Sequence, residues 1–144
     1  MATIKYGIVG YSKNEFDQKR ATQILKECFE KIKKKHPHAI VEIVSGYTNT
    51  GVPKIAYELA DQFGFVTVGF SAEQALNVRC GVYPVQKVIL KGSYFGDESE
   101  YFVRYINALI RVGGGPQSRH ETALFKAISA QQPLNDLLQE FEVE

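Results

Sequence analysis

The segment from Val112 to Thr122 (VGGGPQSRHET) combines the residue types of an anion-binding turn. An apolar run that we expect to be a strand leads into Gly113, Gly114 and Gly115, and an expected helix follows. Glycines permit positive φ angles and leave no side chain between a ligand and the peptide N–H groups. A helix N-terminus adds unpaired donors and partial positive charge. The sequence therefore predicts anion binding here, with Glu121 close to the site.

A second glycine turn, Ser45 to Pro53 (SGYTNTGVP), also lies between an expected strand and an amphipathic helix. Thr48, Asn49 and Thr50 either contact phosphate oxygens or merely cap that helix, which is the commoner use of such residues. Two such turns, with Gly10 to Ser12 as the floor between them, predict a nucleotide site. The candidate ligand-binding residues are Gly10, Ser12, Gly46, Tyr47, Thr48, Asn49, Thr50, Gly51, Gly113, Gly114, Gly115 and Ser118.

The better known phosphate-binding motifs are absent. Gly46 and Gly51 have the spacing of G-x-x-x-x-G-K-[ST], but Val52 and Pro53 occupy the Lys and Ser/Thr positions. No G-x-G-x-x-G follows the first expected strand, which argues against a nicotinamide cofactor. We therefore predict neither a P-loop ATPase nor a resident cofactor.

Glu121 has two interpretations. It could act as a general base or bind sugar hydroxyls. Alternatively, Ser118 caps the helix and Glu121 completes an S-x-x-E capping box. The histidines at 36, 38 and 120 do not have the spacing of metal ligands, so we expect no metal.

Composition excludes several classes of partner. The 144 residues carry 17 Lys and Arg against 16 Asp and Glu, so no overall charge favours nucleic acid or an acidic membrane surface. No segment approaches the roughly 20 apolar residues that span a bilayer, and no leader is evident. Cys28 and Cys80 are far apart in the sequence and are interpreted as reduced thiols. These features predict a cytoplasmic protein without a membrane partner.

Apolar runs and helical stripes alternate along the chain. Strands are expected over residues 4–10, 39–45, 65–70, 85–90 and 108–112, and helices from an Asn14 cap to His36, then over 52–63, 97–107, 119–131 and 134–141. Such alternation is typical of a parallel sheet covered by helices on both faces. We predict a single α/β domain over residues 1–144: a Rossmann-like three-layer α/β/α sandwich whose mostly parallel sheet has about five strands.

An aromatic-rich stretch runs from Ser93 to Tyr105. Most of it is interpreted as core or dimer interface. Tyr94 or Phe95, at the end of a strand, could instead stack on a base.

The two glycine turns, in this order and at this separation, resemble the nucleotide-binding superfamily of the lonely-guy (LOG) phosphoribohydrolases, also named possible lysine decarboxylases. The family turn S-G-G-x-x-x-G-x-M is similar to Ser45–Pro53, with Tyr47 replacing the second glycine. The family motif P-G-G-x-G-T-x-x-E is similar to Val112–Glu121, with Pro-Gln replacing Gly-Thr and the glutamate one residue late. The resemblance implies a divergent member that binds a nucleoside phosphate between these turns and forms homodimers or higher homo-oligomers.

In that family an arginine and the motif glutamate act together in glycosidic cleavage. Here the corresponding stretch, residues 96–100 (GDESE), is acidic, and Arg104 is the available substitute. One hypothesis is a nucleoside 5′-monophosphate phosphoribohydrolase, with Glu121 orienting ribose or water and Arg104 stabilising charge. The alternative is a non-catalytic nucleotide sensor or binding module. A third interpretation makes both glycine turns plain connections.

Overall fold

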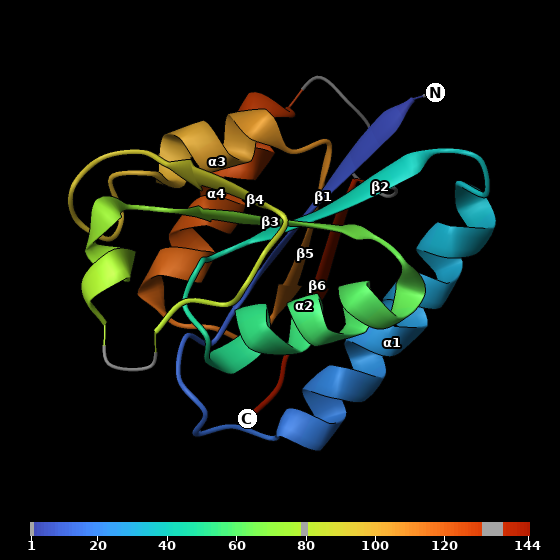
Figure 1. The fold of residues 1–144 in the computed structure, drawn as a ribbon, viewed down its shortest axis with the longest axis horizontal. Helices are drawn as coiled ribbons and strands as arrows, with labels where there is room; N and C mark the ends of the chain where they lie inside the picture. Colours follow the sequence, from blue (N-terminus) through green and yellow to red (C-terminus); the bar gives the residue numbers. More distant parts are fainter. Residues whose placement is uncertain (1, 79–80, 131–136) are drawn as a thin grey trace.

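The computed structural model describes residues 2–78, 81–130 and 137–144. Helices and strands alternate along the chain (Figure 1). The elements are, in order, β1 (Thr3–Gly10), α1 (Gln18–Lys35), β2 (Ile40–Ser45), α2 (Gly51–Phe63), β3 (Val66–Ser71), the 3₁₀ helix η1 (Glu73–Asn77), β4 (Lys87–Leu90), α3 (Ser99–Tyr105), β5 (Ala108–Val112), α4 (Pro116–Ile128) and β6 (Leu138–Phe141).

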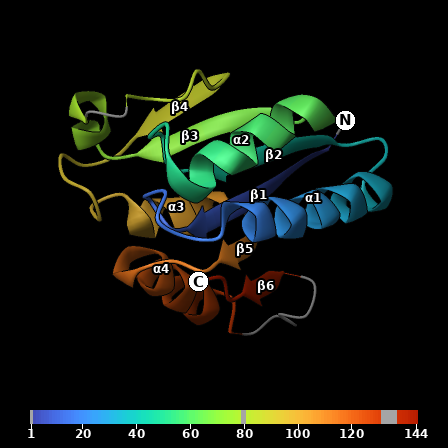
Figure 2. The same ribbon diagram turned by 90° about the horizontal axis from the view of Figure 1, so that it is seen from below.

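The described strands form one sheet of six, in the order β4-β3-β2-β1-β5-β6, and every neighbouring pair is parallel. Figure 2 shows this order from top to bottom. Strands β2 to β4 extend from one side of β1, whereas β5 and β6 extend from the other. The winding therefore reverses between β1 and β5, and ligands of open parallel sheets bind outside the carboxyl ends of the strands at such a point.

Helices cover both faces of the sheet. Helices α1 and α2 pack together on one face, and α3 and α4 cover the other. Adjacent residues of β2 explain the continuous apolar strands: Ile43 is buried in the core with Phe29 of α1, and Val44 is buried in the opposite core with Phe125 of α4. The predicted Rossmann-like three-layer α/β/α sandwich is confirmed, and its sheet is wholly parallel with one strand more than expected.

The additional strand corrects the prediction of a helix over residues 134–141. Residues 134–136 lie outside the described part of the chain, and Leu138–Phe141 forms β6 beside β5. A short apolar run is compatible with either structure. The pairing with β5 decides it, because the edge of the sheet supplies backbone partners such as the Gly113 N–H, which donates to Phe141 O at 2.7 Å.

Two predicted helix caps are also wrong. Helix α1 is capped by Asp17, whose Oδ1 accepts from the Arg20 N–H at 3.0 Å, rather than by Asn14. Helix α4 begins at Pro116 after Gly115, which places Ser118 inside the first turn rather than at the cap. Proline fits this start because its missing N–H would have no helical partner there.

Cys28 is buried in the core and free, and burial raises the pKa of its thiol to about 11. Its interpretation as a reduced core thiol agrees with this environment. Cys80 lies outside the described residues.

Candidate functional site

A cavity of about 620 Å³ opens at the carboxyl ends of the central strands. The ends of β1, β2 and β3 contribute Gly10, Ser45 and Ser71 to its lining, and the first turn of α4 closes another side. The cavity thus lies beside the reversal between β1 and β5. This is the place that the parallel alternation predicts for a ligand.

The turn after β1 supplies polar groups to the cavity. Ser12, Lys13 and Asn14 line it, and Lys13 is a cation that the sequence analysis missed. Asn14 has a second role, because its Oδ1 accepts from the Gly51 N–H at 3.0 Å. This bond joins the turn after β1 to the start of α2.

The N-terminus of α2 has no spare donors for an anion, contrary to the expectation from the sequence. The Gly51 N–H is bound by Asn14, the Val52 N–H donates to Tyr11 O at 2.8 Å, and Pro53 has no N–H. Helix N-termini bind anions through unpaired N–H groups. The first residues of α2 therefore offer no backbone donor to an anion.

The first glycine turn therefore divides into two sets of residues. Gly46, Thr48 and Thr50 line the cavity, and the two hydroxyls can contact a ligand. The other three predicted residues, Tyr47, Asn49 and Gly51, are not part of the lining. Tyr47 packs its ring against Gly69, and the Asn49 N–H donates to Gly81 O at 3.0 Å.

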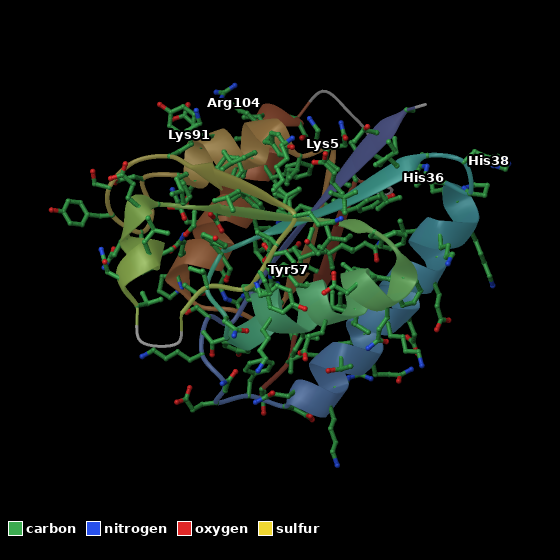
Figure 3. The ribbon with its side chains drawn as sticks, viewed as in Figure 1. Lys5, His36, His38, Tyr57, Lys91 and Arg104 are labelled. Carbon is green, nitrogen blue, oxygen red and sulfur yellow. The ribbon has the colours of Figure 1, made fainter. Side chains whose placement is uncertain are left out.

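Tyr57 of α2 holds the beginning of this turn in place. Its side chain is fully buried, and its hydroxyl lies 2.8 Å from Gly46 O, 2.8 Å from Val68 O and 3.1 Å from the Ser45 N. Figure 3 shows Tyr57 between α2 and the sheet. Burial raises its pKa well above the usual value, so the phenol stays neutral. Tyr57 thus fixes the carboxyl ends of β2 and β3.

In the second glycine turn, Gly113 and Gly114 are explained by the backbone conformation and by close packing rather than by the cavity. Gly113 has φ +60° and Gly114 has φ +110°, and a Cβ there would collide with the Tyr11 ring and the Ser118 hydroxyl, respectively. Only Gly115 lines the cavity. Glycine is therefore required at Gly113 and Gly114 for two reasons: both have positive φ angles, and neither has room for a Cβ.

The start of α4 keeps its donors free for a ligand. The Arg119 N–H donates to Gly115 O at 3.2 Å, so the N–H groups of Gln117 and Ser118 precede the first helical hydrogen bond. Gln117, Ser118 and Gly115 all line the cavity, and the Ser118 hydroxyl donates to Gly115 O at 3.1 Å. Of the two predicted anion sites, this one retains the required groups.

Two buried carboxyl groups line the same cavity. Glu121 accepts a hydrogen bond from Ser99 Oγ at 2.9 Å rather than closing a capping box. Burial raises its pKa to about 7, and the charge of Glu98 contributes, while hydrogen bonds from Ser99 and Gln117 oppose the rise. Glu98 is only 3% exposed. The acidic stretch 96–100 is evident in the sequence, but charged stretches are usually exposed, so the burial of Glu98 was not expected.

Arg104 does not take part in this arrangement. It projects from the outer surface of α3 (Figure 3), and its Nη2 pairs with Glu100 Oε1 at 3.3 Å. It does not line the cavity, and the side chains of both partners are mostly exposed. The structure brings Glu121 to the cavity but separates it from Arg104.

Glu142, which follows β6, pairs with the two arginines that donate hydrogen bonds to the second glycine turn. Arg111, 4% exposed within β5, donates to Gly113 O at 2.8 Å, and its Nη2 pairs with Glu142 Oε2 at 2.7 Å. Arg119 donates to Gly114 O at 3.2 Å and pairs with Glu142 at 2.9 Å. These arginines lower the pKa of Glu142 to about 2. A charged residue in the apolar run ALIRV was the sequence signal for such a network.

Across residues 2–78, 81–130 and 137–144, no cluster of three His, Cys, Asp or Glu side chains could hold a metal ion. In the same part of the chain, no helix combines the length and apolar character needed to cross a membrane.

No family model matches the chain, and no curated protein matches its sequence. Solved structures do match its fold. TM1055 has a TM-score of 0.68 at 20% identity, over 88% of this chain and 70% of its own. A molybdenum cofactor carrier protein from Chlamydomonas reinhardtii has 0.65 at 18% identity, over 96% and 89% of the two chains. The molybdenum cofactor binding protein from Rippkaea orientalis has 0.62 at 17%, over 96% and 88%. The chain is thus a Rossmann-like α/β protein.

Proposed function

We propose that this chain binds a nucleotide or a related phosphorylated small molecule in the cavity at the carboxyl ends of the strands. The observation that carries this proposal is the cavity of about 620 Å³, into which the first turn of α4 opens with unused donors. Ligand pockets of small molecules are typically 300–1,000 Å³. The phosphate would bind the N–H groups of Gln117 and Ser118, with Lys13 and the hydroxyls of Ser12 and Thr50 around it.

Binding without turnover is the form of this function that the geometry supports best. The motif similarity to the LOG family points to nucleoside phosphates, and two of the solved structures with this fold are described as carrying or binding the molybdenum cofactor. Arg104 is remote from the cavity, and the acidic Glu98 lines it instead. A carrier or sensor needs no charge-stabilising arginine, whereas the family's cleavage reaction uses one.

Phosphoribohydrolase activity is the second candidate, and Glu121 is the observation that favours it. A cavity-lining carboxyl group with a pKa of about 7 can exchange a proton near neutral pH. If the chain is a hydrolase, Glu121→Gln abolishes release of the base and spares ligand binding.

The first experiment is thermal unfolding in the presence of nucleoside mono-, di- and triphosphates, ribose 5-phosphate and the molybdenum cofactor. A ligand at about a hundred times its dissociation constant adds roughly 2.7 kcal/mol to the free energy of unfolding. Chromatography of the stabilising compound then shows whether it is intact. We expect stabilisation and an intact ligand, whereas a released base would identify a hydrolase.

Lys13→Gln gives the matched variant, with Lys19→Gln on the exposed side of α1 as its control. Because a charged hydrogen bond to phosphate is worth about 1.5–3 kcal/mol, Lys13→Gln should weaken phosphate ligands about tenfold or more and Lys19→Gln should not. No stabilisation by any phosphorylated compound would contradict the proposed function.

The resemblance also leads us to propose a homodimer or higher homo-oligomer, and the composition leads us to propose a cytoplasmic protein with no nucleic-acid partner. Light scattering coupled to size exclusion tests the assembly. A monomer at all concentrations would contradict it.

A further inference from the structure

The segment between β4 and α3 presents an aromatic ring and a carboxyl group to the same cavity. Phe95 and Glu98 both line it, and Phe95 remains 40% exposed. The segment is held by hydrogen bonds to η1 and within itself. The Phe95 N–H donates to Gln74 Oε1 at 2.8 Å, and Asp97 Oδ2 accepts from the N–H groups of Ser93 and Tyr94 at 3.1 and 3.0 Å. The backbone that carries Phe95 is therefore held in place without a ligand.

Glu98 retains unused capacity to accept hydrogen bonds. Its Oε1 accepts from the Gly96 N–H at 2.7 Å, and its Oε2 accepts from Gln117 Nε2 at 3.3 Å. A carboxylate offers about four lone-pair sites, so each oxygen can accept one more donor. The two donors that the structure shows are neutral, and a buried charge gains stability from every added hydrogen bond. A ligand edge that faces Glu98 is favoured if it carries N–H groups.

Phe95 adds a flat apolar surface next to this acceptor. The Glu98 carboxyl group folds back onto the N–H of Gly96, the residue that follows Phe95. Aromatic side chains stack on the faces of heterocycles, whatever the base. The Glu98 carboxyl group, next to this surface, can accept hydrogen bonds from the edge of a heterocycle that stacks on Phe95.

We propose that Phe95 and Glu98 form a subsite for a planar heterocycle whose edge carries an amino group beside a ring N–H, as in guanine. This subsite rests on the proposed function, because the phosphate end of the same ligand would lie at the start of α4. Gln117 orients the carboxylate through its side chain, while its backbone N–H lies on the phosphate side. Adenine presents a ring acceptor beside its amino group, and hypoxanthine lacks the amino group, so both match Glu98 less well.

The test is isothermal titration calorimetry with guanosine 5′-monophosphate, inosine 5′-monophosphate and ribose 5-phosphate. In the unaltered protein we expect guanosine 5′-monophosphate to bind about tenfold or more tightly than inosine 5′-monophosphate, since a hydrogen bond to a charged group is lost with the amino group. Glu98→Gln should remove this preference and leave the affinity for ribose 5-phosphate unchanged. Glu100→Gln, which alters an exposed carboxyl group two positions away, should change none of the three affinities.

Phe95→Leu provides an independent measurement. It should weaken both nucleotides about equally, preserve the preference between them and leave ribose 5-phosphate unaffected, because stacking does not depend on the amino group. Equal affinities for the two nucleotides in the unaltered protein, with ribose 5-phosphate still bound, would overturn the subsite alone. A preference that survives Glu98→Gln would also overturn it. Failure of every phosphorylated compound to bind would overturn the proposed function and the subsite together.

Discussion

Replacing Glu121 with glutamine should remove one contribution to the pH dependence of the free energy of unfolding. Glu121 is 7% exposed, and its pKa rises from 4.5 to about 7 in the folded chain. Below pH 4.5 the group is protonated in both the folded and the unfolded states, so it has no effect. As the pH rises from 4.5 to 7, the unfolded chain ionises first and folding is disfavoured. Above pH 7 this cost is constant.

The size of the effect follows from the two pKa values. Each pKa unit between the folded and unfolded states corresponds to about 1.4 kcal/mol, so the change from 4.5 to about 7 costs the folded protein roughly 3 kcal/mol at pH 8. Glutamine does not titrate and can still accept the hydrogen bond from Ser99. Relative to the unaltered protein, Glu121→Gln should therefore gain about 3 kcal/mol between pH 4 and pH 8.

Urea unfolding of both proteins across this pH range measures the difference directly, because all other titrating groups are common to the two chains. Glu100→Gln is the control: this side chain is 69% exposed, so its difference from the unaltered protein should stay nearly constant with pH. Parallel stability curves for Glu121→Gln and the unaltered protein would refute the claim that burial raises the pKa of the Glu121 carboxyl group.

Three further predictions concern the supports of the turns. Tyr57→Phe leaves buried backbone groups without the hydroxyl and should lower the free energy of unfolding by about 1–3 kcal/mol; an unchanged value would contradict its role. Gly114→Ala should destabilise the fold by more than about 1 kcal/mol because of its φ of +110°, whereas Gly115→Ala, with open space at its Cβ, should be tolerated. Glu142→Gln should lower the urea midpoint at pH 7. This difference should shrink as the pH falls from 4.5 towards 2, where Glu142 itself becomes protonated; a difference independent of pH would contradict the ion pairs with Arg111.

The sequence predicted those features that depend on local pattern. Mostly apolar runs such as residues 39–45 indicated buried strands, and the helical stripe through Val52 and Leu59 indicated α2. Because parallel strands place their carboxyl ends at one edge, the turns after β1, β2 and β5 were expected to converge. The lining of the cavity by Gly10, Gly46 and Gly115 agrees with that expectation.

The features that the sequence did not reveal depend on partners far away in the chain. Glu142 pairs with Arg111 across β5 and β6, and Glu98 meets Gln117 from another element. The sequence of the turn before α2 also did not show that the Gly51 N–H donates a hydrogen bond to Asn14. Local pattern shows which groups are present, whereas their availability depends on contacts that form only after folding.

The contacts between the turns bear on the ligand that we propose, because they use some of the donors and acceptors around the cavity. Tyr11 accepts from the Val52 N–H through its carbonyl and donates from its hydroxyl to Val143 O at 2.8 Å, so the turn after β1 is fixed to α2 and to the segment after β6. A site held in this way loses little conformational entropy when a ligand binds. Its specificity must then come from the groups that these internal bonds leave unused. Among those groups are the N–H donors at the start of α4, the Lys13 ammonium group and the accepting oxygens of Glu98 and Glu121. We therefore expect a complementary ligand to be anionic at one end and to carry N–H or O–H donors at the other.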